Sequence, residues 1–378
     1  MNHLITLYHL IFVVKIKNNM KVCILGNSLT ALTLAKTLVN LKINVLVLYA
    51  KKKSNLNKTR TIGISKSNID FINENIIYIN PILWKLKKIE IFSDNLIGEK
   101  IIKFEKNNEQ IFSIIQNHHL YKILKNDLSK NKFYNSVLSN NKNLLSKKNY
   151  DLIINCDYNN LITKRYFSKK VIKEYNSSAH TTIITHDKII NNTAIQIFTK
   201  EGPLAFLPIS NNKTSIVFSI HNSKNLQKKN IQQLIKDKNF RYKIKNMDKI
   251  QSFDLQSLNL RSYYHKNILA FGDLLHKVHP LAGQGFNMTI RDIKLLSNII
   301  KNRLDLGLQL DSSINKEFEN SAKYKNLIFL NGVDLIHEFF NIERKIKNNF
   351  LSKSVQKINN YQLINKAFTK FADEGIFS

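Results

Sequence analysis

The sequence is poor in the residues that build cross-linked or metal-bound domains. It has only two cysteines, Cys23 and Cys156, and both stand inside apolar, strand-like runs. Two cysteines in such runs provide no disulfide framework, no CxxC redox pair and no thiolate metal cage, and they suit a reducing compartment. Glycine (10) and proline (4) are scarce among 378 residues, while apolar residues make up 43%. This composition argues against collagen-like repeats and wholesale disorder, and it predicts a folded chain of domain size.

Acidic residues are also few, with 27 Asp plus Glu against 58 Lys plus Arg, which gives a formal net charge of +31. Nearly all the basic residues are lysines spread along the whole chain, whereas a nucleic-acid site favours clustered arginines. We therefore expect no nucleic-acid partner. A cationic surface is attracted to anionic lipid headgroups by about 1 kcal/mol for each nearby lysine. The sequence predicts a cytoplasmic protein that is peripheral on the inner face of a membrane.

Long hydrophobic runs are missing as well. The apolar stretch from Leu4 to Val14 is too short to span a bilayer, and it lacks the basic start and the cleavage site of a signal peptide. The segment MKVCILGN, from Met20, resembles a natural protein start. We therefore expect residues 1–19 to be either a non-native upstream extension or a flexible tail that touches a membrane, and in both cases to lie outside the fold.

The first folded segment predicts a βαβ unit. An apolar run from Lys21 to Leu25 precedes Gly26, helical periodicity covers 30–42, and a second apolar run covers 43–49. Such a unit can hold a dinucleotide pyrophosphate at the helix N-terminus. The GxGxxG fingerprint is degenerate here, since Gly26, Ser28 and Ala31 occupy its three places. The turn could also join a strand to a helix in another α/β fold.

A second motif follows the apolar run at 267–271. Gly272 and Asp273 come directly after this run, and a glycine-containing loop leads into a long helical pattern over 286–304. A carboxylate after a strand can accept hydrogen bonds from a polyol, and loop amides before a helix stabilise negative charge. The ribityl chain of a flavin has hydroxyl groups that need such an acceptor, and the pyrimidine end of the reduced flavin carries negative charge that such amides stabilise. The sequence therefore predicts that Asp273 and the amides of 281–285 hold a flavin.

This second motif, GDLLHKVHPLAGQGFNMTIRD, resembles the GDAAHxxHPLAGQGxNxGxxD signature of the FAD-dependent hydroxylases of ubiquinone biosynthesis. That family is a branch of the para-hydroxybenzoate hydroxylase-like flavin monooxygenases. Arg60 in TRTIGIS, Asn117 in IIQNHHLYKIL and the segment NTAIQIFTKEGPLAFLPI are similar to further family segments. The resemblance covers the chain from about Met20 to Arg303.

The resemblance implies the fold and the activity. The expected fold is α/β, with a Rossmann-like FAD-binding domain built from 20–70, 110–165 and 266–310. A β-sheet substrate domain (71–109 and 166–265) is inserted into it, and a helical region (311–378) follows. The implied reaction is hydroxylation of a polyprenylated phenol with FAD, NAD(P)H and O2, next to other ubiquinone-biosynthesis proteins. In this class the cofactor carries the oxidation chemistry, so no catalytic acid, base or nucleophile is expected.

The resemblance also implies the site residues. The expected loop at the reactive ring comprises Pro280, Leu281, Ala282 and Gly283. The expected cofactor-binding residues are Gly26, Ser28, Ala31, Arg60, Asn117, Asp157, Gly272, Asp273, Gly283, Gln284, Gly285 and Asn287. The residues that could line the substrate pocket, or equally be ordinary sheet core, are Phe198, Phe206, Leu207 and Pro208.

The chain departs from the family at several of these positions. The second cofactor motif, GADGxxS in relatives, is INCDYNN here, so Asp157 is kept and Tyr158 replaces a glycine. Tyr49 stands where an acidic residue usually binds the ribose, and the stretch 124–151 is short and polar. These changes leave open a second hypothesis, a non-catalytic flavoprotein that acts as a scaffold in a membrane-associated complex.

Other functions assembled from the same residues are disfavoured. His276 and His279 are spaced like a metal pair, but no third ligand accompanies them, so we expect no metal. A hydrolase triad of Ser28, His279 and Asp273 lacks the GxSxG elbow. His118 and His119 are expected to flank a helix in a structural role.

Overall fold

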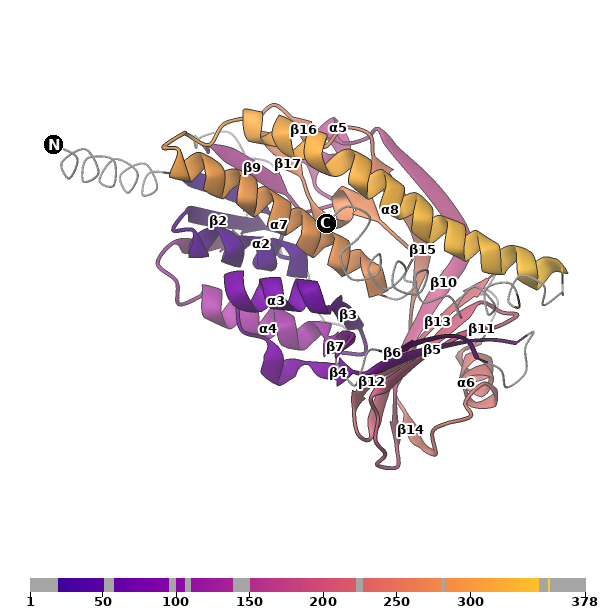
Figure 1. Ribbon diagram of the computed structural model, residues 1–378. Helices are drawn as coiled ribbons and strands as arrows, with labels where there is room; N and C mark the ends of the chain where they lie inside the picture. Colours follow the sequence, from indigo (N-terminus) through magenta and orange to yellow (C-terminus); the bar gives the residue numbers. More distant parts are fainter. Residues whose placement is uncertain are drawn as a thin grey trace.

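The two apolar runs of the predicted βαβ unit form neighbouring parallel strands. In the computed structural model, β1 (Lys21–Leu25) pairs in parallel with β2 (Asn44–Tyr49), and α2 (Leu29–Asn40) connects them (Figure 1). Residues Val22 to Leu25 are buried, as expected of a strand covered on both faces. The prediction of a βαβ unit at this place is confirmed.

The structure describes most of the chain between residues 20 and 353. The described ranges are 20–50, 58–94, 100–105, 110–138, 150–221, 227–279, 283–346 and residue 353.

β1 belongs to a six-stranded sheet with the order β16-β17-β9-β1-β2-β8. All its neighbouring strands are parallel except for the β16–β17 hairpin. The four further strands are β8 (Tyr134–Leu138), β9 (Leu152–Asn155), β16 (Tyr264–His265) and β17 (Ile268–Ala270). Helix α4 (Asn117–Leu128) packs against α2, and α5 (Leu161–Tyr166) follows β9. The sheet thus joins distant parts of the chain.

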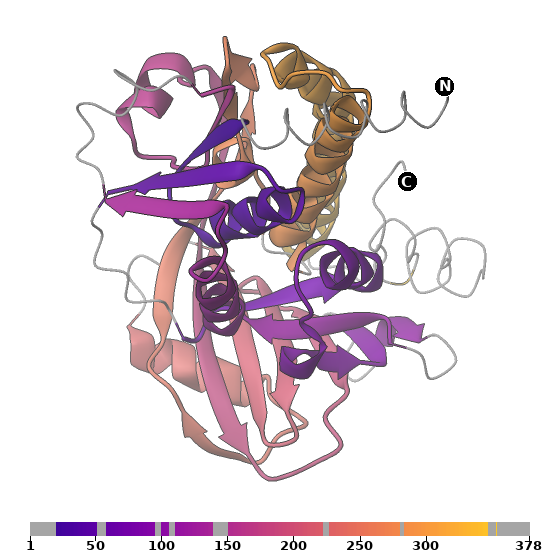
Figure 2. The same cartoon turned by 90° about the vertical axis from the view of Figure 1, so that its left-hand side faces the viewer.

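A nine-stranded sheet forms the other end of the molecule (Figure 2). Its strands run in the order β18-β15-β10-β13-β12-β11-β5-β6, and β14 also pairs with β10. Their bounds are β5 (Lys88–Ser93), β6 (Lys100–Glu105), β10 (Lys170–His186), β11 (Thr193–Phe198), β12 (Pro203–Ser210), β13 (Lys213–His221), β14 (Ile244–Met247), β15 (Gln251–Leu260) and β18 (His276–Lys277). Helix α6 (Lys228–Asp237) buries Ile231 and Ile235 against one face of this sheet.

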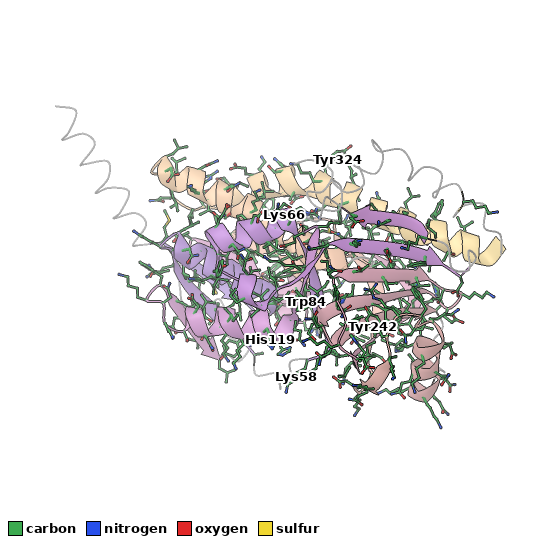
Figure 3. The ribbon with its side chains drawn as sticks, turned by 60° about the horizontal axis from the view of Figure 1, so that its bottom comes forward. Lys58, Lys66, Trp84, His119, Tyr242 and Tyr324 are labelled. Carbon is green, nitrogen blue, oxygen red and sulfur yellow. The ribbon has the colours of Figure 1, made fainter. Side chains whose placement is uncertain are left out.

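A small sheet connects the two ends. It has the order β3-β7-β4, with β3 (Thr61–Ser65), β7 (Phe112–Gln116) and β4 (Trp84–Leu86). Helix α3 (Lys66–Asn75) follows β3, and the short helix η1 (Asn80–Ile82) precedes β4. Trp84 donates from its indole Nε1 to the carbonyl of Asn191, 2.6 Å away, which fixes β4 to the large sheet (Figure 3).

Two long helices cover both ends. Helix α7 (Gln284–Asp305) and helix α8 (Ser313–Ile346) lie side by side along one side of the molecule (Figure 1). Phe318 of α8 is part of the core of the six-stranded sheet, whereas Phe329 and Val333 pack with Phe198 of the large sheet. In the described part of the chain, no helix has the length and apolarity needed to cross a membrane.

A buried hydrogen-bonded group joins these helices to the strand before them. His276 Nε2 of β18 lies 2.5 Å from the carboxylate of Asp292 in α7, and Asn326 of α8 donates to the other oxygen of Asp292 at 3.1 Å. All three side chains are buried. Each polar group therefore finds its partner on a different element, which fixes the position of α7 against both neighbours.

We predict that Asp292→Ala destabilises the fold by about 3–5 kcal/mol, because it leaves the partners of a buried carboxylate without a hydrogen bond. Urea unfolding followed by circular dichroism measures the change. The control is Glu317→Ala, which breaks the half-exposed pair with Arg303 at 3.4 Å and should cost less than about 1 kcal/mol. Equal losses for the two variants would contradict the prediction.

Candidate functional site

Three parallel strands end at the same edge of the six-stranded sheet. β1 is followed by Gly26, β9 by Cys156 and Asp157, and β17 by Phe271, Gly272 and Asp273. The strands are neighbours in the order β17-β9-β1, and Cys156 N donates to the carbonyl of Leu25 at 2.9 Å. The structure therefore brings Gly26, Asp157 and Asp273 together although they are distant in the sequence.

Gly26 has a conformation that only glycine adopts readily. Its φ is +105°, and a Cβ at this position would lie 3.3 Å from the Cβ of Asp157. Gly272, with φ of +66°, is equally constrained, because a Cβ there would lie 2.6 Å from Thr30 Cγ2 in the first turn of α2. The two glycine turns and the start of α2 thus form one closely packed unit.

Ser28 takes the N-cap position of α2. Its hydroxyl accepts a hydrogen bond from Ala31 N at 3.3 Å, and Ala31 is completely buried. Serine is a favoured N-cap residue. The serine that replaces the second glycine of the fingerprint therefore stabilises the helix start, and the other amides of the first turn are left for a ligand.

The turn after β9 tolerates a side chain where relatives have glycine. Among the described residues, the non-glycine positions with positive φ are Lys42, Asn176 and Lys266, so Tyr158 is not one of them. Asn155 and Asn160 exchange amide hydrogen bonds beneath this turn. Burial raises the pKa of the Cys156 thiol, and the nearby carboxylates of Asp273 and Asp157 raise it further.

The ammonium groups of two lysines lie beside the ring of Tyr158. Lys170 Nζ donates to its phenol oxygen at 2.6 Å and lies 4.2 Å from the ring centroid, and Lys277 Nζ lies 4.1 Å from the same centroid. The residue that replaces a glycine thus creates a cationic patch beside Asp157.

The start of α7 lies against β3. Gly283, with φ of +67°, is the N-cap of α7, and a Cβ there would lie 3.1 Å from Gly63 N. Asn287 accepts from Ser65 N and donates to the carbonyl of Gly63, both at 3.0 Å. Its amide is therefore engaged by the protein and holds the loop end in place. The sequence does contain a signal for this contact, because Gly63 lies inside a strand pattern and such a glycine often marks a close approach of backbone.

The other residues predicted near α7 have different surroundings. Gln284 is buried in the first turn, whereas Gly285 is half-buried and has room for a Cβ, 3.6 Å from Val278 Cγ1. Pro280, Leu281 and Ala282 lie outside the described residues.

Arg60 and Asn117 also meet, as the sequence suggests. Asn117 N donates to the carbonyl of Arg60 at 3.1 Å, and Asn117 Oδ1 is buried without a partner among the described residues. The rings of His118 and His119 follow, with centroids 4.1 Å apart. Burial and then the charges of His119, Lys58 and Lys122 lower the pKa of His118 (Figure 3 labels Lys58 and His119).

The predicted pocket residues lie on opposite faces of the large sheet. Phe198 packs against Met288 and α8, and Leu207 packs against the small sheet. Phe206 packs under α6 on the other face, and by alternation Pro208 shares that face. Of the four, Phe198 and Leu207 therefore lie on the face of the large sheet that α7, α8 and the small sheet cover.

His279 is the last described residue before the gap at 280–282. It is 1% exposed, and neither ring nitrogen has a hydrogen-bond partner in the described part of the chain. Burial, and then the neighbouring imidazoles of His337 and His221, lower the pKa of His279 to about 2. Its side chain is therefore neutral at physiological pH.

Comparison with known proteins agrees with this geometry. A family model described as squalene epoxidase matches residues 149–331. The 3-demethoxyubiquinol 3-hydroxylase of Escherichia coli is 31% identical over 38% of this chain and 39% of its own length. The mitochondrial ubiquinone biosynthesis monooxygenase COQ6 of Danio rerio is 24% identical over 54% of this chain and 50% of its own length. The chain thus spans half or less of the length of these relatives.

Solved structures show the same fold. The structure of Klebsiella pneumoniae HpxO complexed with FAD and uric acid has a TM-score of 0.74 and covers 94% of this chain and 97% of its own, at 10% identity. The predicted α/β fold of the FAD-dependent monooxygenases is confirmed, and so is the resemblance to the hydroxylases of ubiquinone biosynthesis.

The burial of His279 predicts a pH dependence of stability. The unfolded chain binds a proton on this residue below about pH 6.5, and the folded chain does not until about pH 2. The stability that the neutral form contributes is therefore lost as the pH falls below 6.5.

We predict that the drop in unfolding free energy between pH 7 and pH 5 is about 2 kcal/mol smaller in His279→Phe than in the wild type. Urea unfolding at both pH values measures it, and the histidines that do not neighbour His279 contribute equally to both proteins. An unchanged pH dependence would show that His279 is protonated in the folded state.

Proposed function

We propose that this chain, a relative of the FAD-dependent hydroxylases of ubiquinone biosynthesis, is an FAD-dependent monooxygenase that hydroxylates a polyprenylated phenol with NAD(P)H and O2. The observation that carries the proposal is the convergence of Gly26, Asp157 and Asp273 at one sheet edge, beside the start of α2. The names of the relatives support the substrate class.

The residues at this edge fit FAD. Gly26 and Gly283 have positive φ and lie where a side chain would crowd Asp157 and Gly63, so backbone can approach a ligand closely. Neither α2 nor α7 has an acidic residue in its first turn, and α7 has no side-chain cap. Both helix starts therefore present positive dipole ends to an anionic group.

Each residue has a proposed role in holding the cofactor. Asp273, which is exposed, accepts hydrogen bonds from the ribityl hydroxyls, and the first turn of α2 holds the pyrophosphate. The start of α7, with Gly283, Gln284 and Gly285, stabilises negative charge at the pyrimidine end. Arg60 and Asn117, which are joined by a backbone hydrogen bond, are assigned to the adenosine side, and Pro280, Leu281 and Ala282, which lie outside the described residues, keep their expected role at the ring. Bound FAD supplies the transfer of electrons from NAD(P)H and the activation of O2.

We propose that the two large sheets have different functions. We assign cofactor binding to the six-stranded sheet and its helices, and substrate binding to the face of the nine-stranded sheet that carries Phe198 and Leu207. Hydrophobic surface on that face suits a prenylated ring, and a buried site limits the access of water.

We assign the source of such a substrate to a membrane surface. Along the outer face of α8, four apolar residues follow helical spacing, and Tyr324 and Leu335 are the most exposed, at 66% and 71% (Figure 3 labels Tyr324). The others are Leu327 and Ile342. Together with a net charge of +31, this stripe supports peripheral association with anionic lipid, near other ubiquinone-biosynthesis proteins.

The second candidate function is a non-catalytic scaffold that keeps the flavoprotein fold. Tyr158, with its two lysines, and Tyr49, at the end of β2, favour it because both replace residues with cofactor roles in relatives. Titration of the protein with FAD, followed by flavin fluorescence, separates the two candidates. The monooxygenase requires saturable binding, then oxidation of NAD(P)H that depends on a prenylated phenol and incorporation of isotopically labelled O2 into the product. A folded protein that binds no FAD would favour the scaffold.

We predict that Asp273→Ala weakens FAD binding by about 10- to 100-fold, because hydrogen bonds to a charged group contribute about 1.5–3 kcal/mol. Flavin fluorescence titration gives the dissociation constants. Asp237→Ala is the matched control, since Asp237 ends α6 on the far face of the large sheet, and it should leave the constant unchanged. Equal constants for wild type and Asp273→Ala would remove Asp273 from the cofactor site.

A further inference from the structure

Gly63 of β3 is enclosed from two sides. On the edge of β3 that faces away from β7, the start of α7 approaches its backbone, since a Cβ on Gly283 would lie 3.1 Å from Gly63 N and 3.4 Å from Gly63 Cα. On the face of β3, the ring of Phe112 takes the place of a side chain, because a Cβ on Gly63 would lie only 2.1 Å from Phe112 Cε1. Gly63 thus lies between an aromatic ring and the start of α7.

The register of β3 and β7 accounts for the contact with the ring. Phe112 pairs with Ser65, so its side chain lies on the same face of the small sheet as the position of Gly63, two residues away. A diagonal neighbour in an antiparallel pair is within reach of an aromatic ring. Gly63 is not among the described glycines with positive φ, so its backbone does not require glycine. The ring of Phe112 is the feature that leaves no room for a side chain there.

The edge of β3 is joined to α7 by one side chain. The amide of Asn287 accepts from Ser65 N and donates to the carbonyl of Gly63, both at 3.0 Å, and it satisfies this edge as a neighbouring strand would. The same amide donates to the carbonyl of Gly283 at 3.4 Å. Because β3 and the first turn of α7 share these hydrogen bonds, a displacement of β3 moves the start of α7 with it.

The ring of Phe112 also contacts a small apolar cluster. It is half-buried and packs against Leu86 and Ile114 of the small sheet and Ala194 of the large sheet. The ring therefore fills the space between Gly63 and the large sheet. Without the ring, β3 would be free to move toward the large sheet and away from its present contact with α7.

We propose that Phe112 is a positioning residue for the flavin. Through Gly63 and Asn287 it sets the place of the first turn of α7, whose positive dipole end stabilises negative charge at the pyrimidine end of the cofactor. Reduced flavin carries more of this charge than oxidised flavin, so a displaced helix start weakens binding of the reduced form more. The inference rests on the proposed function and deepens it, because it assigns control of the flavin midpoint potential to a residue of the small sheet.

Removal of the ring tests the inference. In FAD-loaded Phe112→Ala, we expect reduced FAD to lose at least about threefold more affinity than oxidised FAD, which lowers the midpoint potential by at least about 15 mV for a two-electron couple. A merely structural role would weaken both forms equally and leave the potential unchanged. In the double variant Gly63→Ala/Phe112→Ala, the new methyl group occupies part of the space of the ring, so part of the lost potential should return. Redox titration followed by the visible absorption of the flavin measures these values.

A second measurement needs no cofactor. The amide of Ser65 is buried and bonded to Asn287 Oδ1, so its hydrogen exchange reports the contact between β3 and α7. We expect this exchange to be at least about tenfold faster in FAD-free Phe112→Ala than in the wild type. Ile89→Ala is the matched control, since Ile89 of β5 is half-buried and packs against the same apolar cluster from the large sheet. It should change neither the potential nor the exchange.

The two measurements separate this inference from the proposed function. An unchanged midpoint potential or an unchanged exchange rate of Ser65 in Phe112→Ala would overturn the inference, and so would equal changes in Ile89→Ala. A wild type that binds no FAD contradicts the proposed function, and the exchange rate of Ser65 still decides whether Phe112 positions the start of α7.

Discussion

The parallel pairing of β17, β9 and β1 is the constraint on which the candidate site depends. Parallel neighbours end at the same edge of a sheet, so the residues after each strand must meet. Gly26, Asp157 and Asp273 come from three separated parts of the chain and reach this edge for that reason. The start of α2 is fixed there too, because Thr30 fills the space that the missing side chain of Gly272 leaves. Any ligand held at this edge is therefore held by backbone geometry first and by side chains second.

The departures from the family pattern change the chemistry of this edge without changing its shape. Ser28 gives its hydroxyl to the helix start, and Tyr158 needs no left-handed backbone. Tyr49, at the end of β2, has aromatic neighbours, since it contributes, after burial, to the raised pKa of Tyr121. The loss of an acidic residue and the gain of two ammonium groups at Tyr158 make this side more cationic. This more cationic edge can still hold a phosphate-bearing cofactor. The ammonium groups attract the negative charge of the phosphates, whereas glycines would only leave room for them.

The local features of the site could be predicted from the sequence, and the long-range ones could not. The βαβ unit and the motif at 267–273 depend on periodicity within one segment, and the structure has them at the expected places. The opposite orientations of Phe206 and Leu207 also follow from strand alternation, which the sequence alone supplies. In contrast, the contact of Gly283 with Gly63 and the bonds of Asn287 to β3 join segments that no local pattern relates. The same holds for His337, whose place beside His279 depends on how α8 crosses the large sheet.

His276 and His279 show how two residues of one motif can serve different purposes. Both are almost fully buried, and both precede α7 in the chain, with His276 in β18 and His279 after the end of that strand. His276 bonds to Asp292, which also accepts a hydrogen bond from Asn326. The buried polar atoms of these three side chains are thus paired within the protein, and the stability that they contribute accounts for their burial. His279 has no such partner among the described residues, so its burial opposes folding. Burial of His276 therefore stabilises the fold through its partners, whereas burial of His279 makes the stability depend on pH, because burial lowers the pKa of its side chain.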